Sequence, residues 1–205
     1  MKTRYLILTL SIFLFSQALL AQTTFKLDPK TSSITIEGTS SVHDWEMTAT
    51  EMDASMKVNL QDQKIDEILN VNFSVLSEGL KSKNSLMDKK TYNALKSDKH
   101  NKIAFTLQSV NDLSATAKNL SGTAHGTLSI AGKTLPVTIP FSGVIQKDFT
   151  ISVTGKEKIN MKDFNISPPT AMMGTMKTGE EVTVHFNVNF QPESVYAEVG
   201  QSSRN

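Results

Sequence analysis

Residues 120–145, LSGTAHGTLSIAGKTLPVTIPFSGVI, indicate the fold of this 205-residue chain. Small or apolar residues alternate with polar ones from position 120 to 130, and the alternation resumes from 135 to 145 after Ala131, Gly132 and Lys133. A period of two is typical of a strand with one buried face, and a short turn containing Gly between two such runs predicts a hairpin. We therefore expect a long antiparallel hairpin at this position.

The same period recurs along most of the chain. Further predicted strands cover residues 33–38, 44–49, 52–60, 69–75, 103–107, 149–153 and 182–190. Only residues 83–96 break the pattern, because Met87, Thr91 and Leu95 recur every four residues, as on one face of a short amphipathic helix. About eight strands with one inserted helix predict an all-β fold, an eight-stranded antiparallel barrel, since closure removes exposed sheet edges.

Two glycines on one face of the hairpin, Gly122 and Gly126, have more than one interpretation. They could let the strand bend at a corner of the barrel, leave room inside for a ligand, or mark a bulge. The sequence leaves these alternatives open.

The N-terminus predicts export. Lys2 and Arg4 precede an apolar run over residues 5–15, and the small residue Ala21 stands before the polar Gln22. This order is typical of a cleavable secretory signal, here residues 1–21, and we expect a periplasmic or secreted protein. A retained anchor is the less favoured alternative. Residues 22–191 then form one domain, and residues 192–205 a polar tail.

The composition excludes several kinds of chemistry. The chain has no Cys, so thiolate metal sites and Cys nucleophiles are absent, and a net charge of +1 argues against a nucleic-acid partner. Its four His residues show no metal-ligand spacing, so we expect neither a metal nor another cofactor. His43 and Asp44 are the one plausible acid/base pair, and an enzyme at the barrel mouth is a minor alternative.

Adaptable apolar residues gather in the segment 166–179. Pro168 and Pro169 should keep it from forming a strand, which predicts a loop carrying Met172, Met173 and Met176. This loop either plugs one end of the barrel or lines a lipid portal. With the inward-facing residues of the strands and helix, the predicted ligand-binding set is Trp45, Met47, Phe73, Val75, Met87, Phe105, Leu107, Phe141, Phe164, Met172, Met173, Met176 and Phe186.

Three stretches resemble the YceI-like lipid/polyisoprenoid-binding family. They are residues 85–110, similar to the family's helix and I-x-F strand; residues 122–137, similar to its G-x-L-T-I-x-G-x-x-x-P-V hairpin; and residues 161–184, similar to its D-F-x-I … G-x-x-V segment. The chain departs from the family pattern at Asn101, at Asn165 and in the helix, where the usual aromatic pair is reduced to Tyr92 and Leu95.

The resemblance implies a lipocalin-like barrel that holds a long isoprenoid or similar amphiphilic lipid, in the periplasm, as a carrier without enzymatic activity. Transient membrane contact and a homodimer are compatible with that role. The alternative is an exported structural or envelope-stress interaction module whose core is filled. A continuous apolar cavity of several hundred Å³ would distinguish the carrier, since ligand pockets typically measure about 300–1,000 Å³.

Overall fold

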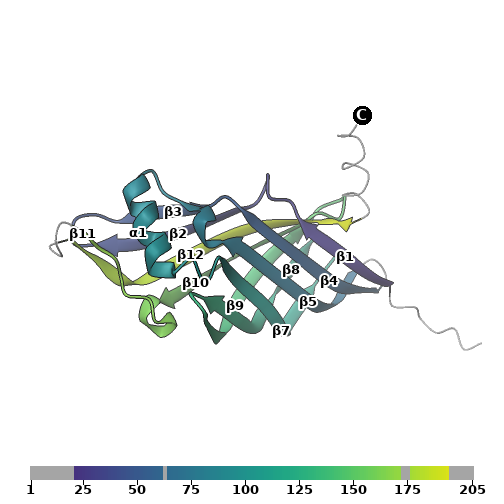
Figure 1. The fold of residues 1–205 in the computed structure, drawn as a ribbon. Helices are drawn as coiled ribbons and strands as arrows, with labels where there is room; N and C mark the ends of the chain where they lie inside the picture. The colour runs from purple at the N-terminus through teal and green to yellow at the C-terminus, as the bar shows by residue number, and fades with distance from the viewer. Residues whose placement is uncertain (1–20, 62–63, 172–175, 194–205) are drawn as a thin grey trace, which may run out of the picture.

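The structure is a computed structural model that describes residues 21–61, 64–171 and 176–193. Within these ranges it contains one α-helix, two 3₁₀ turns and twelve strands (Figure 1). The strands are β1 (Ala21–Leu27), β2 (Ser33–Ser40), β3 (Trp45–Ala49), β4 (Met52–Gln61), β5 (Lys64–Leu76), β6 (Leu80–Lys81), β7 (Lys102–Ala115), β8 (Asn119–Ile130), β9 (Lys133–Ile145), β10 (Ile151–Asn160), β11 (Thr170–Ala171) and β12 (Met176–Pro192). The helical elements are η1 (Ser77–Gly79), α1 (Ser85–Leu95) and η2 (Met161–Phe164).

Eight of these strands close into an antiparallel barrel. Their order is β1, β4, β5, β7, β8, β9, β10 and β12, and β12 pairs back with β1. The closing register matches Phe25 with Pro192 and Leu27 with Phe190. The predicted all-β, eight-stranded barrel with one inserted helix is therefore confirmed.

The strand that closes the barrel, β1, is absent from the sequence prediction, which begins its first strand at residue 33. β1 and β2 follow one another along the same edge of β12 and are interrupted at residues 28–32. Phe25 and Leu27 are almost fully buried. The alternation in β1 covers only a few residues, so the sequence pattern alone does not identify it as a strand. Its pairing with β4 and β12 does.

The hairpin predicted over residues 120–145 is confirmed as β8 and β9. Ile130 pairs with Lys133 across a two-residue turn in which Ala131 has φ 50° and Gly132 has φ 83°. Positive φ at both central positions is the type I′ geometry, whose twist matches that of the flanking strands. The ring of His100 occupies the space beside Gly132, where a Cβ would lie 2.5 Å from its Cε1 atom.

Several predicted strand bounds are wrong. β5 begins at Lys64, before the predicted residue 69, and β7 runs to Ala115, beyond the predicted residue 107. β10 begins at Ile151 and runs to Asn160, while Phe149 lies in the preceding turn at φ 63°. β12 begins at Met176, so this residue belongs to a strand and not to a loop. The prolines remove amide donors only at 168 and 169, and pairing resumes at once between Thr170 and Lys177.

Several predicted features lie outside the described residues: Met172, Met173, most of the signal segment and most of the polar tail. In the part of the chain that the structure describes, no helix is long and apolar enough to cross a membrane.

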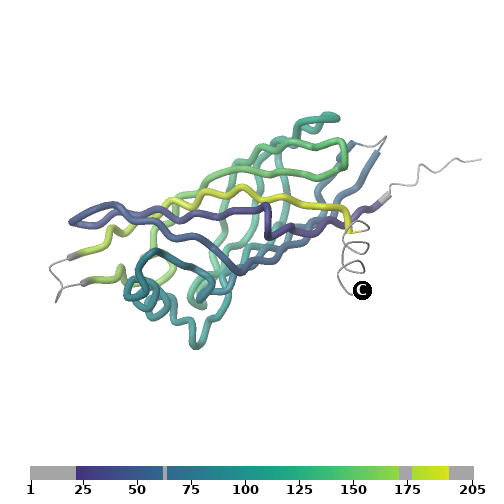
Figure 2. Tube along the Cα trace, turned by 90° about the horizontal axis from the view of Figure 1, so that it is seen from above, coloured from purple at the N-terminus to yellow at the C-terminus, as the bar shows by residue number. Residues whose placement is uncertain are grey.

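The β2–β3 hairpin and the first part of β12 project together beyond one end of the barrel, and α1 lies beside them (Figure 2). Asn84 begins α1 by accepting hydrogen bonds on its side-chain oxygen from the backbone N–H groups of Leu86, at 2.9 Å, and Met87. The Tyr92 hydroxyl donates to the Leu80 carbonyl at 2.9 Å, which ties the helix to β6. The predicted helix over residues 83–96 is thus confirmed.

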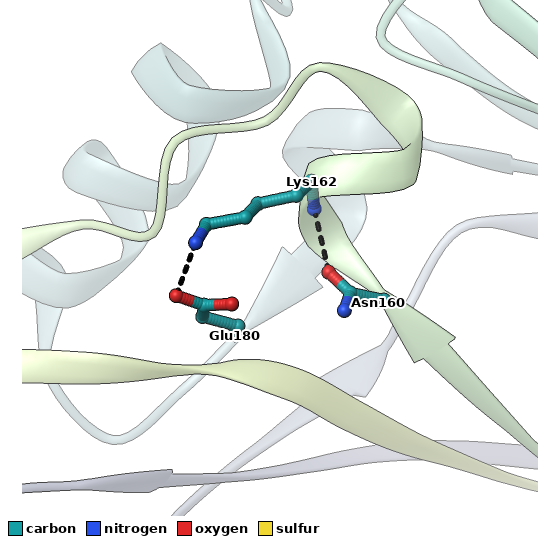
Figure 3. Close-up of polar contacts among 3 residues, drawn as sticks. All are labelled: Asn160, Lys162 and Glu180. Atoms are coloured by element: carbon teal, nitrogen blue, oxygen red, sulfur yellow. Dashed lines mark hydrogen bonds and ion pairs between the residues drawn. The ribbon is translucent and has the colours of Figure 1, made fainter.

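The turn η2 follows β10 and is held against β12 by polar contacts (Figure 3). The Asn160 side chain accepts a hydrogen bond from the Lys162 backbone N–H at 3.0 Å, and the Lys162 ammonium pairs with Glu180 of β12. These contacts hold Met161 and Ile166 in buried positions.

Candidate ligand-binding cavity

The barrel is hollow. A cavity of about 510 Å³ runs between the inward faces of the strands and the inner face of α1. Almost all of its lining is aliphatic or aromatic, and the volume lies within the range of about 300–1,000 Å³ that ligand pockets typically have. The side chains therefore enclose space instead of interdigitating to fill it.

A row of alternating glycines and phenylalanines shows how this space is kept open. The register places five inward positions side by side across β8, β9, β10, β12 and β2: Gly122, Phe141, Gly155, Phe186 and Ile34. A Cβ on Gly155 would lie 2.4 Å from Phe186 Cζ, and one on Gly122 would lie 3.1 Å from Phe141 Cζ. Each ring packs over a neighbouring glycine, so the ring lies against the barrel wall and fills less of the cavity.

Two further rings follow the same principle. The Trp45 ring occupies the Cβ space of Gly38, and the Phe105 ring that of Gly126, where a Cβ would lie 2.6 Å from Phe105 Cε2. The β7 strand is also irregular opposite both hairpin glycines, with register shifts next to Leu107 and next to Asn111. The glycines thus combine two of the interpretations left open: they face bulges and they make room inside the barrel.

The cavity brings together nine residues of the predicted ligand-binding set: Trp45, Met47, Phe73, Val75, Met87, Phe105, Leu107, Phe141 and Phe186. Phe164 is buried in η2 and packs in the core without lining the cavity. Met172 and Met173 lie outside the described residues, and so does the side chain of Met176.

Polar residues gather at one end of the cavity, which we call the mouth: Ser40, His43, Asn84, Lys90, Thr170 and Thr178. They come from the β2–β3 hairpin, α1 and the β11–β12 region. The Lys90 ammonium donates to the Thr170 carbonyl and so links α1 to β11. The helix face predicted from Met87, Thr91 and Leu95 lines the cavity, so α1 forms part of its wall at this end.

The His43 ring contacts the backbone of Asp44. His43 Nδ1 lies 2.8 Å from the backbone oxygen of Asp44, not from its carboxylate. Among the described residues, no group of His, Asp and Glu side chains could hold a metal ion. This geometry does not form the oriented acid/base pair that an enzyme at the mouth would need.

Much of the lining was not predicted from the sequence, and Glu157 is the charged residue among it that faces the middle of the cavity. Glu157 of β10 is a carboxylate that lines the cavity among apolar side chains. The strand prediction stopped at residue 153, because Gly155 and Glu157 interrupt the apolar alternation. The signal that could have found it is parity, since Glu157 shares a face with Val153 and Ile159.

A closed eight-stranded barrel around an apolar cavity with a polar mouth is a lipocalin-like barrel. The sequence pattern of the YceI-like domain matches residues 25–190, and the chain belongs to this family. No curated protein sequence matches it significantly.

Solved structures share the fold at low identity. BcnA of Burkholderia cenocepacia is 14% identical with a TM-score of 0.64, over 80% of this chain and 98% of that one. A polyisoprenoid-binding domain of Saccharophagus degradans, implicated in plant cell wall breakdown, is 11% identical with a TM-score of 0.65, over 84% and 99%. The Campylobacter jejuni YceI protein is 16% identical with a TM-score of 0.55, over 70% and 82%.

Proposed function

We propose that this protein is an exported carrier of a long-chain isoprenoid or similar amphiphilic lipid, which it holds in the barrel. The observation that carries the proposal is the apolar cavity of about 510 Å³. Family membership supports it, as does the fold shared with a polyisoprenoid-binding domain. A module with a filled core would have no such space, and the described residues of the mouth form no oriented acid/base pair.

The energetics suit exchange better than permanent storage. Burying one CH₂ group away from water contributes about 0.8 kcal/mol, so a long tail is held firmly against an aqueous surrounding. Lipid tails are about as apolar as an aliphatic pocket, so moving a ligand from a bilayer into the barrel changes the hydrophobic free energy little. Such a protein would load and unload at membranes.

The export part of the proposal rests on the N-terminal sequence. The basic start, the apolar run and Ala21 before Gln22 support cleavage after residue 21 and a periplasmic or secreted mature chain. Cell fractionation with mass spectrometry of the mature N-terminus tests it. An intact N-terminus in the cytoplasmic fraction would overturn this part.

Cavity occupancy tests the carrier directly. Trp45 is the sole Trp and lines the cavity, so its fluorescence should change when delipidated protein is titrated with a polyisoprenol. Ala124→Phe places a ring in the cavity and should abolish saturable binding. Ala104→Phe is the matched control, because Ala104 is on the neighbouring strand and does not line the cavity. Equal binding by both variants, or none by the unaltered protein, would contradict the proposal.

Membrane contact at the mouth completes the carrier proposal. Val42 and Leu86 are 63% and 62% exposed, one beside the lining residue His43 and the other beside Met87. Lys83 and Lys89 are exposed near Leu86, and basic residues beside apolar ones are favourable at an anionic bilayer surface. We expect this end to face the membrane during exchange.

Lipid transfer from anionic vesicles tests the orientation. Val42→Asp should slow transfer without changing the amount bound at equilibrium, since Val42 does not line the cavity. Val144→Asp is the control, because Val144 is 52% exposed and pairs with Ser152 toward the other end of the barrel. Equal transfer rates for the two variants would rule out docking through the mouth.

A further inference from the structure

Glu157 is placed on the cavity wall by the alternation of β10. Gly155, Glu157 and Ile159 face inward, while Lys156 and Lys158 are exposed, and Lys158 pairs with Glu181 at 2.9 Å on the outer surface. Across the sheet the register continues the inward row from Glu157 to Val184, Ile36 and Met47. A carboxylate therefore stands in a row of aliphatic and thioether side chains.

In the ranges that the structure describes, the Glu157 carboxylate has no partner. None of the described residues donates a hydrogen bond to it or forms an ion pair with it. The other charged lining residue in the described ranges, apart from His43, is Lys90, whose ammonium donates to the Thr170 carbonyl at the mouth. The wall around Glu157 leaves its acceptor oxygens free toward the cavity.

The half-buried position of Glu157 disfavours its charged form. A carboxylate that loses water without gaining a hydrogen-bond donor is destabilised in its charged form, and burial accordingly raises the pKa of Glu157. An aliphatic residue would complete the apolar row at no such cost. The missing donor can be supplied by a molecule that enters the cavity.

Glu157 lies between the polar mouth and the wholly apolar levels of the cavity. The row next to it toward the mouth contains Ile159, Val182, Gly38 and Trp45. Away from the mouth lie the glycine–phenylalanine row and then a wholly apolar level with Leu120, Val153 and Val188. A ligand that enters tail first would fill the apolar levels and leave its head beside Glu157.

We propose that Glu157 recognises the headgroup of the carried lipid: it accepts a hydrogen bond from a hydroxyl or another neutral donor and excludes anionic headgroups. This inference rests on the proposed carrier function and specifies its ligand class. A carboxylate or phosphate head would place a second negative charge next to Glu157 in a half-buried site, whereas an alcohol provides the donor that the wall lacks.

The test compares ligands that differ only in their heads. Delipidated protein is titrated at pH 8 with a long-chain alcohol and with the fatty acid of the same length, and binding is followed by Trp45 fluorescence. The unaltered protein should prefer the alcohol by about tenfold or more, the factor expected for a hydrogen bond to a charged group.

Two substitutions separate the acceptor from the charge. Glu157→Gln removes the charge but keeps an acceptor, so it should gain affinity for the fatty acid and retain most affinity for the alcohol. Glu157→Leu removes both and should bind the alcohol about tenfold more weakly. Glu46→Gln is the control, since Glu46 is an exposed neighbour of Met47 that does not line the cavity.

The outcomes distinguish this inference from the carrier proposal. If the unaltered protein binds both ligands and the Glu157 variants keep the same preference, the recognition role is wrong while the carrier stands. If neither ligand binds, the carrier fails and this inference fails with it. Thermal unfolding followed by circular dichroism verifies that each variant is folded.

Discussion

The ring of Trp45 occupies the space that a side chain on Gly38 would need. The two residues face each other across β2 and β3, and a Cβ on Gly38 would lie 2.2 Å from Trp45 Cζ2. The indole N–H donates to the Thr39 carbonyl at 3.0 Å, which fixes the ring over its partner strand. Near the mouth, as in the glycine–phenylalanine row, the aromatic ring fits because the residue opposite it is a glycine and has no side chain.

Gly38→Ala should displace the Trp45 ring. All three atoms nearest to the new methyl group belong to this ring, so we expect a loss of about 1–3 kcal/mol and a changed Trp emission spectrum. Urea unfolding measures the loss. In a Trp45→Ala background the same substitution should cost much less, and an unchanged cost there would show that the ring is not the obstacle.

Phe25→Ala should weaken the closure of the barrel. Phe25 is 2% exposed and pairs with both Met56 of β4 and Pro192 of β12. Truncating a buried Phe typically costs about 3–5 kcal/mol, and denaturant unfolding should detect a loss of this size. Gln22→Ala on the same strand is exposed and should change stability by less than about 0.5 kcal/mol. Similar losses for both variants would contradict a closing role for the Phe25 side chain.

Asn84→Ala should loosen α1 at the mouth. It removes the acceptor of the Leu86 and Met87 N–H groups, and loss of such a cap costs about 0.5–2 kcal/mol. Thermal unfolding should report the loss, and lipid release should become up to about fivefold faster if the first turn frays. Asn84→Asp keeps an acceptor and should behave like the unaltered protein. A faster release from Asn84→Asp alone would point to charge instead of capping.

The stability of the lipid-free protein should depend on the charge of Glu157. Burial raises its pKa above the ordinary value of 4.5, so the folded state holds the proton more tightly than the unfolded chain does. Stability is then lost as the pH rises from the unfolded pKa through the folded one. Glu157→Gln avoids this loss, so its advantage over the unaltered protein should grow as the pH rises from about 4 to 8. Urea unfolding across this range measures the difference.

The control for this pH dependence is Glu46→Gln, which removes one carboxylate from the outer surface. Its stability curve should run parallel to that of the unaltered protein. A parallel curve for Glu157→Gln as well would mean that the cavity does not disfavour the charged carboxylate.

Local patterns in the sequence account for the elements that could be predicted. The β8–β9 hairpin, α1 and the inward positions of β5, β7 and β12 are visible in the sequence because each depends on neighbouring residues and a regular period. β10 was cut short where Gly155 and Glu157 replace apolar residues, and these two positions serve the cavity. The pattern also missed β1 and ended β7 at residue 107 instead of Ala115, because a register shift after Leu107 breaks the alternation there.

The sequence by itself determined which faces of the strands avoid water, where the long hairpin turns and where the helix interrupts the sheet. Only the tertiary structure decided that β1 closes the barrel, that the rings lean over glycines, and that Glu157 stands alone on the wall. Alternation records that a side chain points inward but not what lies opposite it. The enclosed volume depends on pairings between distant strands, which no local pattern contains.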